Sequence, residues 1–301
     1  AEPLFRSSIV PSLDDLKKRI KSVKSTQKIT KAMKMVAAAK LKKAQENAEK
    51  GRPYSKKLQN IILNLTKSIT EDSNAPKLLI GTGKDKVYLC VVITADRGLC
   101  GGFNSNICKL AKSHFKNILK EGKELKIITV GSKGHDQIKS EYGEYIIDKK
   151  SFKDKKKITF NEANEIGKKV IQLYEQEQFD KCLVFYNNFK NVITQIPQAE
   201  QIIPTFVKKE AKDENQVFSY EFEPDEDEIL EDLLPKNVSV QIFKAFLENA
   251  ASEQGSRMTA MDNATRNAGD LVDKLTINYN RSRQASITKE LIEIISGAES
   301  L

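Results

Sequence analysis

One stretch of this sequence contains residue types that could bind a phosphate group. Residues 96–104 read Asp-Arg-Gly-Leu-Cys-Gly-Gly-Phe-Asn, and they lie between a β-branched run and an amphipathic pattern. A glycine-rich turn between a strand and a helix can present backbone N–H groups to a phosphate. The glycine spacing matches neither the dinucleotide fingerprint nor the phosphate-loop motif. We therefore interpret the loop as a structural strand-to-helix connection, built by Asp96, Arg97, Gly98, Gly101 and Gly102.

Other residues that could do chemistry are sparse. The chain has four cysteines without a Cys-x-x-Cys pair, and only two histidines, His114 and His135. No Ser-His-Asp or Cys-His set stands at a credible spacing, and a zinc site needs more clustered ligands. Cys100 begins a predicted helix but has no partner histidine, so we interpret it as structural. We expect no catalytic residue, no cofactor and no metal, and a reducing compartment.

The elements that would position this loop are two long helical patterns at the two ends of the chain. Their apolar and small residues recur at alternating spacings of three and four, which keeps one face of a helix against a neighbouring helix. The stretch from Lys236 to Ser296 has no proline, and as one helix it would be on the order of 90 Å long. The first series is Leu13, Leu16, Ile20, Val23, Gln27, Thr30, Lys34, Ala37, Leu41, Ala44 and Ala48. The second is Val240, Phe243, Leu247, Ala250, Gln254, Arg257, Met261, Ala264, Ala268, Leu271, Leu275, Asn278, Ser282 and Ala285.

Between these patterns the periodicity changes to alternating strands and helices. Strands are expected at 87–94, 125–130, 144–148, 181–186 and 192–203, with helices at 105–119, 131–140 and 161–178. This alternation predicts a parallel, Rossmann-like sheet with an antiparallel edge, and a turn at Asn187-Asn188. Gly51 and Pro53 predict a kink or a break in the first helix.

The predicted fold class is α/β: a long antiparallel coiled coil of N- and C-terminal helices with an inserted Rossmann-like α/β domain. An N-terminal extension covers residues 1–11, and the N-terminal rod helix covers 12–70. The Rossmann-like domain covers 77–209, an acidic connecting loop 210–235, and the C-terminal rod helix 236–301.

Charge is unevenly distributed along the chain. The net charge is +9, but residues 17–57 contain 15 Lys/Arg against two Glu, whereas residues 210–232 contain 11 Asp/Glu against one Lys. A basic stripe along the first helix can be a solvated face, a nucleic-acid contact or a contact for an acidic protein surface. Tyr54 is the only aromatic residue of the basic stretch, so no base-stacking platform accompanies the charge. This favours the acidic protein surface. The stripe consists of Lys17, Lys21, Lys24, Lys28 and Lys31.

Several motifs together resemble the gamma subunit of the rotary F-type ATP synthase. They are residues 24–40, residues 94–104, Ser252-Glu253-Gln254 with Arg257-Met258 and Ala260-Met261, and residues 279–298. The closing pattern is Ile287, Thr288, Glu290, Glu293, Gly297 and Ala298. The motifs occur in the family's order over nearly the whole chain. Residues 149–157 and 210–232 depart from the pattern, and the regulatory cysteine insert of chloroplast members is not apparent.

The resemblance implies a non-catalytic central stalk that turns inside a ring of alpha and beta subunits. It further implies contacts with the small delta and epsilon stalk subunits and with the c-ring. It implies neither a nucleic-acid partner nor a membrane-spanning segment in this chain. Lys31, Met33 and Lys34 are expected to face an acidic loop of beta. Arg257, Gln284 and Thr288 are expected to touch the alpha/beta ring.

Two other interpretations stay open at this point. A nucleotide-binding enzyme would use the Asp96–Asn104 loop, and a nucleic-acid-binding coiled coil would use the basic face. The start at Ala1-Glu2-Pro3 without a methionine predicts a processed chain. This start favours the matrix side of the mitochondrial inner membrane, with the cytoplasmic side of a bacterial plasma membrane as the alternative.

Overall fold

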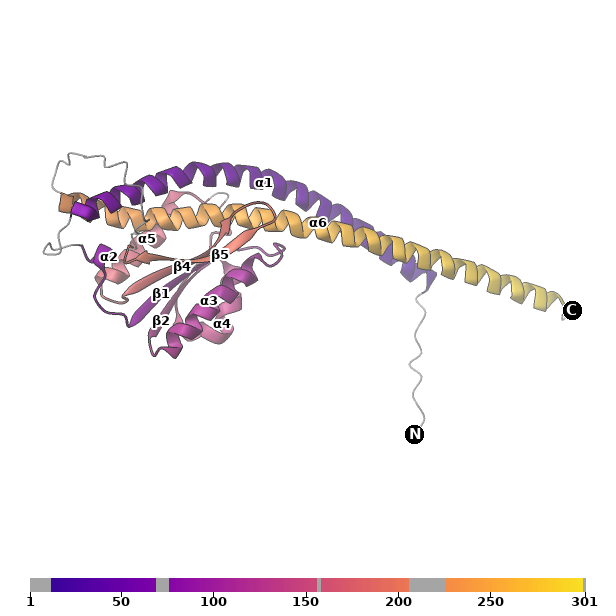
Figure 1. The fold of residues 1–301 in the computed structure, drawn as a ribbon. Helices are drawn as coiled ribbons and strands as arrows, with labels where there is room; N and C mark the ends of the chain where they lie inside the picture. The colour runs from indigo at the N-terminus through magenta and orange to yellow at the C-terminus, as the bar shows by residue number, and fades with distance from the viewer. Residues whose placement is uncertain (1–11, 69–75, 156–157, 206–225, 300–301) are drawn as a thin grey trace, which may run out of the picture. The chain divides into compact units, whose positions relative to one another are not determined.

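The computed structural model describes residues 12–68, 76–155, 158–205 and 226–299 (Figure 1). The chain divides into two compact units, one of residues 1–36 with 258–301, and one of residues 37–257. The second unit contains a five-stranded sheet in the order β3-β2-β1-β4-β5. No helix among the described residues is both long and apolar enough to cross a bilayer.

Helix α1 spans Leu13–Ser68. Ser12 caps its start, because the Ser12 Oγ accepts a hydrogen bond from the Asp15 N–H at 3.1 Å. Gly51 and Pro53 were expected to kink or interrupt this helix. The interruption is wrong, because Pro53 lies inside the continuous helix, and the kink stays a prediction. Packing explains the difference, since a Cβ on Gly51 would lie 2.8 Å from Leu247 Cδ1, and buried residues follow on α1 in the next turns. A larger residue at position 51 would require the Leu247 side chain to shift.

Helix α6 spans Glu226–Glu299 and contains Pro235. It begins before the predicted start at Lys236, so the expectation that residues 226–235 belong to a connecting loop is wrong. Leu230 and Leu234 are fully buried in one cluster with α1 residues Leu58, Ile62 and Leu65. This burial stabilises the additional helical turns despite the proline. The rest of the acidic segment, residues 210–225, lies outside the described residues.

The sheet confirms the Rossmann-like expectation. Strand β1 pairs in parallel with β2 and β4, β2 pairs in parallel with β3, and β5 forms the antiparallel edge against β4. The expected turn at Asn187-Asn188 is wrong, because both residues lie in β4 and pair with β5. The strands are β1 Val87–Ile93, β2 Glu124–Val130, β3 Ile146–Lys150, β4 Lys181–Phe189 and β5 Gln195–Ile203.

Helices cover both faces of this sheet (Figure 1). Residues of α3 and α4 share one apolar cluster with one face, and residues of α5 and α6 share another cluster with the opposite face. The part of α6 in this unit is therefore a layer of the α/β domain, not only half of a coiled coil. The helices are α2 Lys77–Ile80, α3 Phe103–Lys120, α4 Ser132–Tyr142 and α5 Phe160–Glu175, with a 3₁₀ turn at Gly143–Tyr145.

Candidate interaction surfaces

The loop after β1 is held by the chain's own hydrogen bonds. The Asp96 carboxylate accepts bonds from the backbone N–H groups of Ser132 at 2.8 Å and Phe152 at 3.0 Å, and from the Ser151 hydroxyl at 2.7 Å. Asp96 therefore joins the ends of three neighbouring strands. Its carboxylate oxygens are thus satisfied by two backbone N–H groups and one hydroxyl of the chain itself.

Helix α6 also binds this loop. The Ser256 hydroxyl donates to the Cys100 carbonyl at 2.6 Å, and Arg257 Nη2 donates to the Gly98 carbonyl at 3.2 Å. Leu99 and Gly101 have positive φ angles of 61° and 57°, so the loop turns sharply between the two contacts. Gly102 precedes α3, and Arg97 is exposed.

Burial raises the pKa of the Cys100 thiol, so the helix start does not activate it. Cys100 is 2% exposed, and its sulfur accepts a hydrogen bond from Asn104 Nδ2 at 3.3 Å. A buried thiol that stays protonated is a poor nucleophile and a poor metal ligand. Among the described residues no three His, Cys, Asp or Glu side chains converge on a possible metal position.

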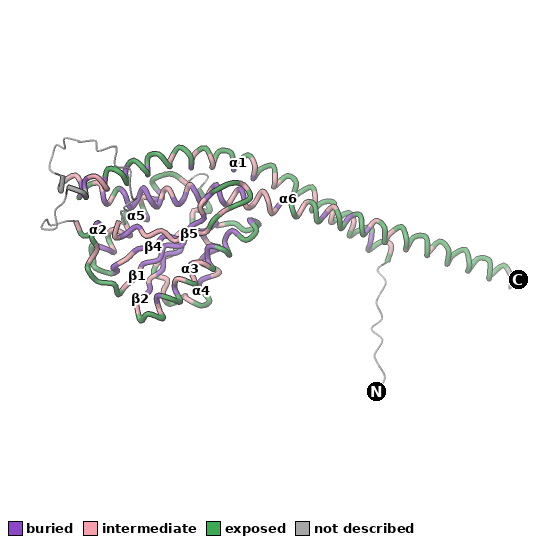
Figure 2. The backbone as a smooth tube through the Cα atoms, viewed as in Figure 1, coloured by how far each residue is buried: buried purple, intermediate pink, exposed green. Residues whose placement is uncertain are grey.

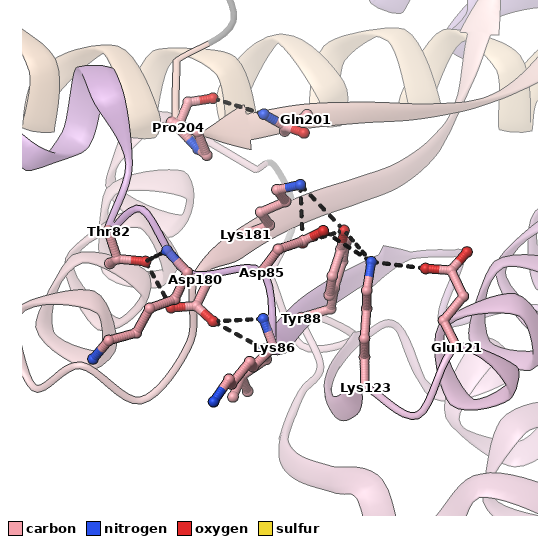
Figure 3. Close-up of polar contacts among 12 residues, drawn as sticks. Thr82, Asp85, Lys86, Tyr88, Glu121, Lys123, Asp180, Lys181, Gln201 and Pro204 are labelled. Carbon is pink, nitrogen blue, oxygen red and sulfur yellow. Dashed lines mark hydrogen bonds and ion pairs between the residues drawn. The ribbon is translucent and has the colours of Figure 1, made fainter.

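A compact charge cluster lies at the amino ends of β1, β2 and β4, opposite the end that carries the loop (Figure 3). Asp85 accepts hydrogen bonds from the Tyr88 hydroxyl at 2.6 Å and from Lys123 at 2.9 Å, and it pairs with Lys181 at 2.9 Å. These contacts, the Tyr88 bond first, lower the pKa of Asp85. Both ammonium groups also lie over the Tyr88 ring, at 5.0 and 5.5 Å from its centre. Asp85 and Glu121 thus compensate the charge of the two lysines within the chain.

In the first unit, α1 and α6 meet along a seam with a polar layer. The Thr30 and Thr265 hydroxyls lie 2.7 Å apart, and Lys34 Nζ lies 2.6 Å from Asp262 Oδ1. The Lys34 contact lowers the pKa of Asp262. Part of the expected contact charge at Lys34 is thus compensated within the chain, whereas Lys31 is exposed and Met33 is half-buried.

The buried side of α6 in this unit differs from the predicted seam. The prediction and the structure share Met261, Ala268 and Leu275, but the structure buries Val272 where the sequence pattern favoured Leu271, which is 42% exposed. After Met261 the prediction placed the next seam residue three positions on, at Ala264. In the structure it lies four positions on, at Thr265, which contacts α1. Ala285 is exposed, so the expectation that it lies in the seam is wrong.

From Ile277 to Ala298 no residue of α6 is buried, and most are exposed (Figure 2). Gln284 and Thr288 both face solvent, and the Thr288 hydroxyl donates to the Gln284 carbonyl at 2.9 Å. Several large apolar side chains are exposed on the same segment, and our sequence analysis missed them as a surface. Their signal was present, because they lie off the predicted seam positions. They are Ile277, Ile287, Leu291, Ile292, Ile294 and Ile295.

Exposed apolar side chains also occur on α1, beside the basic stripe. Ile29, Met35 and Val36 are each more than half exposed. The five lysines of the stripe are exposed as well. A surface that combines exposed apolar groups with charge is typical of a protein–protein contact.

Known proteins match the chain over almost its full length. A family model described as ATP synthase matches residues 12–301. The ATP synthase gamma chain of Pelagibacter ubique is 70% identical over 290 residues, which cover 96% of this chain and 99% of the relative. The chain belongs to the ATP synthase gamma chain family. It is therefore a central-stalk rotor subunit of an ATP synthase.

Further relatives agree with this assignment. The ATP synthase gamma chain of Rhizobium leguminosarum is 57% identical over 294 residues, covering 97% of this chain and 100% of the relative. A central stalk and c-ring structure of the Tetrahymena thermophila mitochondrial ATP synthase matches with a TM-score of 0.57 and 26% identity, over 78% of this chain and 99% of that chain. A Euglena gracilis mitochondrial ATP synthase rotor shares the fold, with a TM-score of 0.62 and 19% identity over 91% of this chain and 98% of that chain.

Proposed function

We propose that this chain is the non-catalytic shaft that couples proton-driven rotation of the c-ring to conformational changes in the alpha/beta ring. One observation supports the contact surface most directly. From Ile277 to Ala298 no residue of α6 is buried in the chain, although this segment contains six exposed large apolar side chains. A soluble helix rarely leaves so much apolar surface in water unless a partner covers it.

The same surface explains how a shaft without chemistry of its own can direct catalysis. The exposed side chains differ from one side of the helix to another. At a given rotation angle of the shaft, each surrounding beta subunit would therefore contact different groups. Those different contacts favour a different conformation in each subunit, and rotation shifts the populations in turn. The delta and epsilon subunits and the c-ring would bind the α/β domain.

Individual contact roles are part of the proposal. Lys31 and Met33 would face an acidic loop of beta, with Lys34 held nearby by Asp262. Gln284 and Thr288 are exposed and available to the alpha/beta ring. The Arg257 guanidinium already binds Glu253 at 2.6 Å and the Gly98 carbonyl. We therefore propose that a partner subunit would contact Arg257 in the orientation that these two groups fix.

A substitution at Met33 tests the placement of the acidic loop. Met33→Lys adds a cation where that loop is proposed to pass, and an over-strong ion pair in a partly desolvated contact should trap one rotary state. We expect the assembled complex in vesicles to hydrolyse ATP with poor coupling to proton pumping, while its yield is unchanged. Met33→Leu preserves volume and neutrality, and it should behave like the parent. Unchanged coupling in Met33→Lys would contradict the placement.

The absence of catalysis is tested on the isolated chain. Calorimetric titration with ATP and Mg²⁺ should give no stoichiometric binding at micromolar concentration, because the Asp96–Asn104 loop uses its polar groups within the chain. Tight binding would instead support the nucleotide-binding enzyme.

The location that we propose is peripheral, at an energy-transducing membrane. Relatives from Pelagibacter and Rhizobium are 70% and 57% identical, whereas the matched mitochondrial structures are 26% and 19% identical. This favours the cytoplasmic side of a bacterial plasma membrane over the matrix side of the mitochondrial inner membrane. Fractionation of source cells, followed by release of the complex at low ionic strength, tests the choice.

A further inference from the structure

A short stretch of α6 is hydrogen-bonded to the carboxyl ends of the central strands. Asn249 Oδ1 accepts from the Asn187 N–H at 3.1 Å, and Asn249 Nδ2 donates to the Ile93 carbonyl at 3.4 Å. One turn later, the Ser252 hydroxyl donates to the Asn187 carbonyl at 3.1 Å. One turn beyond that, Ser256 binds the Cys100 carbonyl. These residues recur about every four positions, so they form one polar stripe along the helix.

The strands offer these backbone groups because they differ in length. Strand β4 pairs with β1 only as far as Val92 opposite Phe185, yet it continues to Phe189. Asn187 lies two residues beyond this last pair, where β1 has already ended. The free backbone groups of Asn187 are satisfied by α6 instead.

The same place also joins α1. Arg52 binds Glu248 through two bonds, Nε to Oε1 at 2.6 Å and Nη2 to Oε2 at 2.9 Å, and it donates to the Phe189 carbonyl at 2.9 Å. Glu248 in turn accepts from the Phe189 N–H at 3.1 Å. A bidentate pair of this kind fixes orientation as well as distance. Both long helices are thus bonded to the end of β4.

Elsewhere in this unit α6 packs on the sheet mainly through apolar contacts. Two polar contacts lie beside them: Lys244 Nζ is 3.0 Å from Glu200 Oε1 of β5, and the Ser239 hydroxyl donates to Asn164 Oδ1 of α5 at 3.1 Å. Val238, Ile242 and Phe246 lie in the cluster that covers the sheet face. Apolar contacts are not directional, so packed helices can slide by small amounts without losing them. Hydrogen bonds weaken steeply when their angle falls, and a slide by one helical rise of about 1.5 Å would break the polar stripe. The stripe therefore supplies buried, directional resistance to sliding and twisting, whereas the Lys244–Glu200 pair is partly exposed to water.

We propose that Asn249 and Ser252, with Glu248 and Arg52, form the joint that transmits torque between the α/β domain and the shaft helices. They act as positioning residues, since they touch neither nucleotide nor proton path. This inference rests on the proposed function of the chain as a shaft. Asn249 and Ser252 are 4% and 0% exposed, so their bonds are shielded from competing water.

The test uses the assembled ATP synthase carrying Asn249→Leu with Ser252→Ala, which removes three of the bonds while the side chain at position 249 keeps its branched shape and its number of heavy atoms. The matched control is Ile242→Ala, which destabilises the apolar part of the same layer. With the alpha/beta ring immobilised and the rotor stalled, a probe on the exposed face of α3 reports angular fluctuations of the α/β domain. We expect a wider angular distribution and a loss of pumping against a proton gradient in the double variant, with unloaded hydrolysis unchanged. The control should retain the parent distribution.

A second measurement covers the case in which the double variant does not assemble. In Ser252→Ala alone, hydrogen exchange at the end of β4 in the assembled complex should be roughly fivefold faster, with a smaller increase in angular width. Equal angular widths in the polar variants and the parent would overturn the proposal, as would equal widening in Ile242→Ala. If the parent complex itself fails to couple hydrolysis to pumping, the proposed function fails and the joint with it.

Discussion

The two halves of α6 have opposite surroundings within the chain. Between Asn237 and Ser252 most side chains are buried on nearly every side of the helix, because α1 and the sheet domain both pack there. Between Ile277 and Ala298 none is buried. Both halves contain large apolar residues, so hydrophobic content does not separate them. The same helix therefore serves as a core layer in one unit, and we propose that it serves as a contact surface in the other.

The largest expected effect contrasts one isoleucine from each half. Ile242 is 0% exposed in the apolar cluster, so Ile242→Ala should lower the free energy of unfolding of the isolated chain by about 2–5 kcal/mol. Ile292 is 57% exposed, and Ile292→Ala should change it by less than about 0.5 kcal/mol. Urea unfolding followed by circular dichroism measures both.

In the assembled complex we expect Ile292→Ala to have an effect that it lacks in the isolated chain. If Ile292 contacts the alpha/beta ring, Ile292→Ala lowers the yield or the coupling of the reconstituted complex although the isolated chain is as stable as the parent. A complex with Ile292→Ala that assembles and couples like the parent would remove Ile292 from the contact surface.

A smaller effect is expected at the polar layer between Thr30 and Thr265. Thr30→Val and Thr265→Val each remove the contact between the two helices, but the remaining hydroxyl keeps a backbone carbonyl of its own helix, Met261 or Gln27, as a partner. The double variant removes both hydroxyls. The coupling energy from the double-mutant cycle should be about 0.5–1.5 kcal/mol. Additive effects would mean that the 2.7 Å contact does not stabilise the register of the two helices.

The smallest expected effect is a pH dependence of the stability of the second unit, through Glu162 at the start of α5. A hydrogen bond from Lys155, followed by bonds from the Thr159 side chain and N–H, lowers the pKa of Glu162 from 4.5 to about 2. Because the folded-state pKa is depressed, the stabilisation is fully present above pH 4.5 and is lost as the pH falls toward 2. Melting temperatures of the parent and Glu162→Gln should therefore differ at pH 6 and converge near pH 2. An equal difference at both values would mean that the capping contact does not depend on the charge.

The sequence predicted an element well where its apolar pattern follows one simple period. The seam of α1 was predicted correctly at Leu16, Ala37 and Leu41, all buried, since α1 follows a simple helical period. The parallel strands were recognised from their β-branched runs. The phase of the α6 seam was wrong at Leu271, because both phases contain small or apolar residues and only the packing against α1 distinguishes them.

Local signals failed where tertiary packing opposed them. Pro53 and Pro235 predict the ends of helices, but the helices continue because buried apolar residues on both sides of each proline gain more free energy than the lost backbone bond costs. The Asn187-Asn188 pair predicts a turn, but β4 continues through it since α6 satisfies the backbone of Asn187. Neither outcome is visible in a window of neighbouring residues.

For the candidate site, the sequence by itself determined the order of elements, the basic stripe and the family resemblance. These depend on residue type and period, which need no knowledge of the partner. The tertiary structure decided that the glycine-rich loop is occupied by Ser256 and Arg257, and that Lys34 is paired with Asp262. Such pairings join residues more than 150 positions apart, and their geometry is set only when the helices dock on the sheet and on each other.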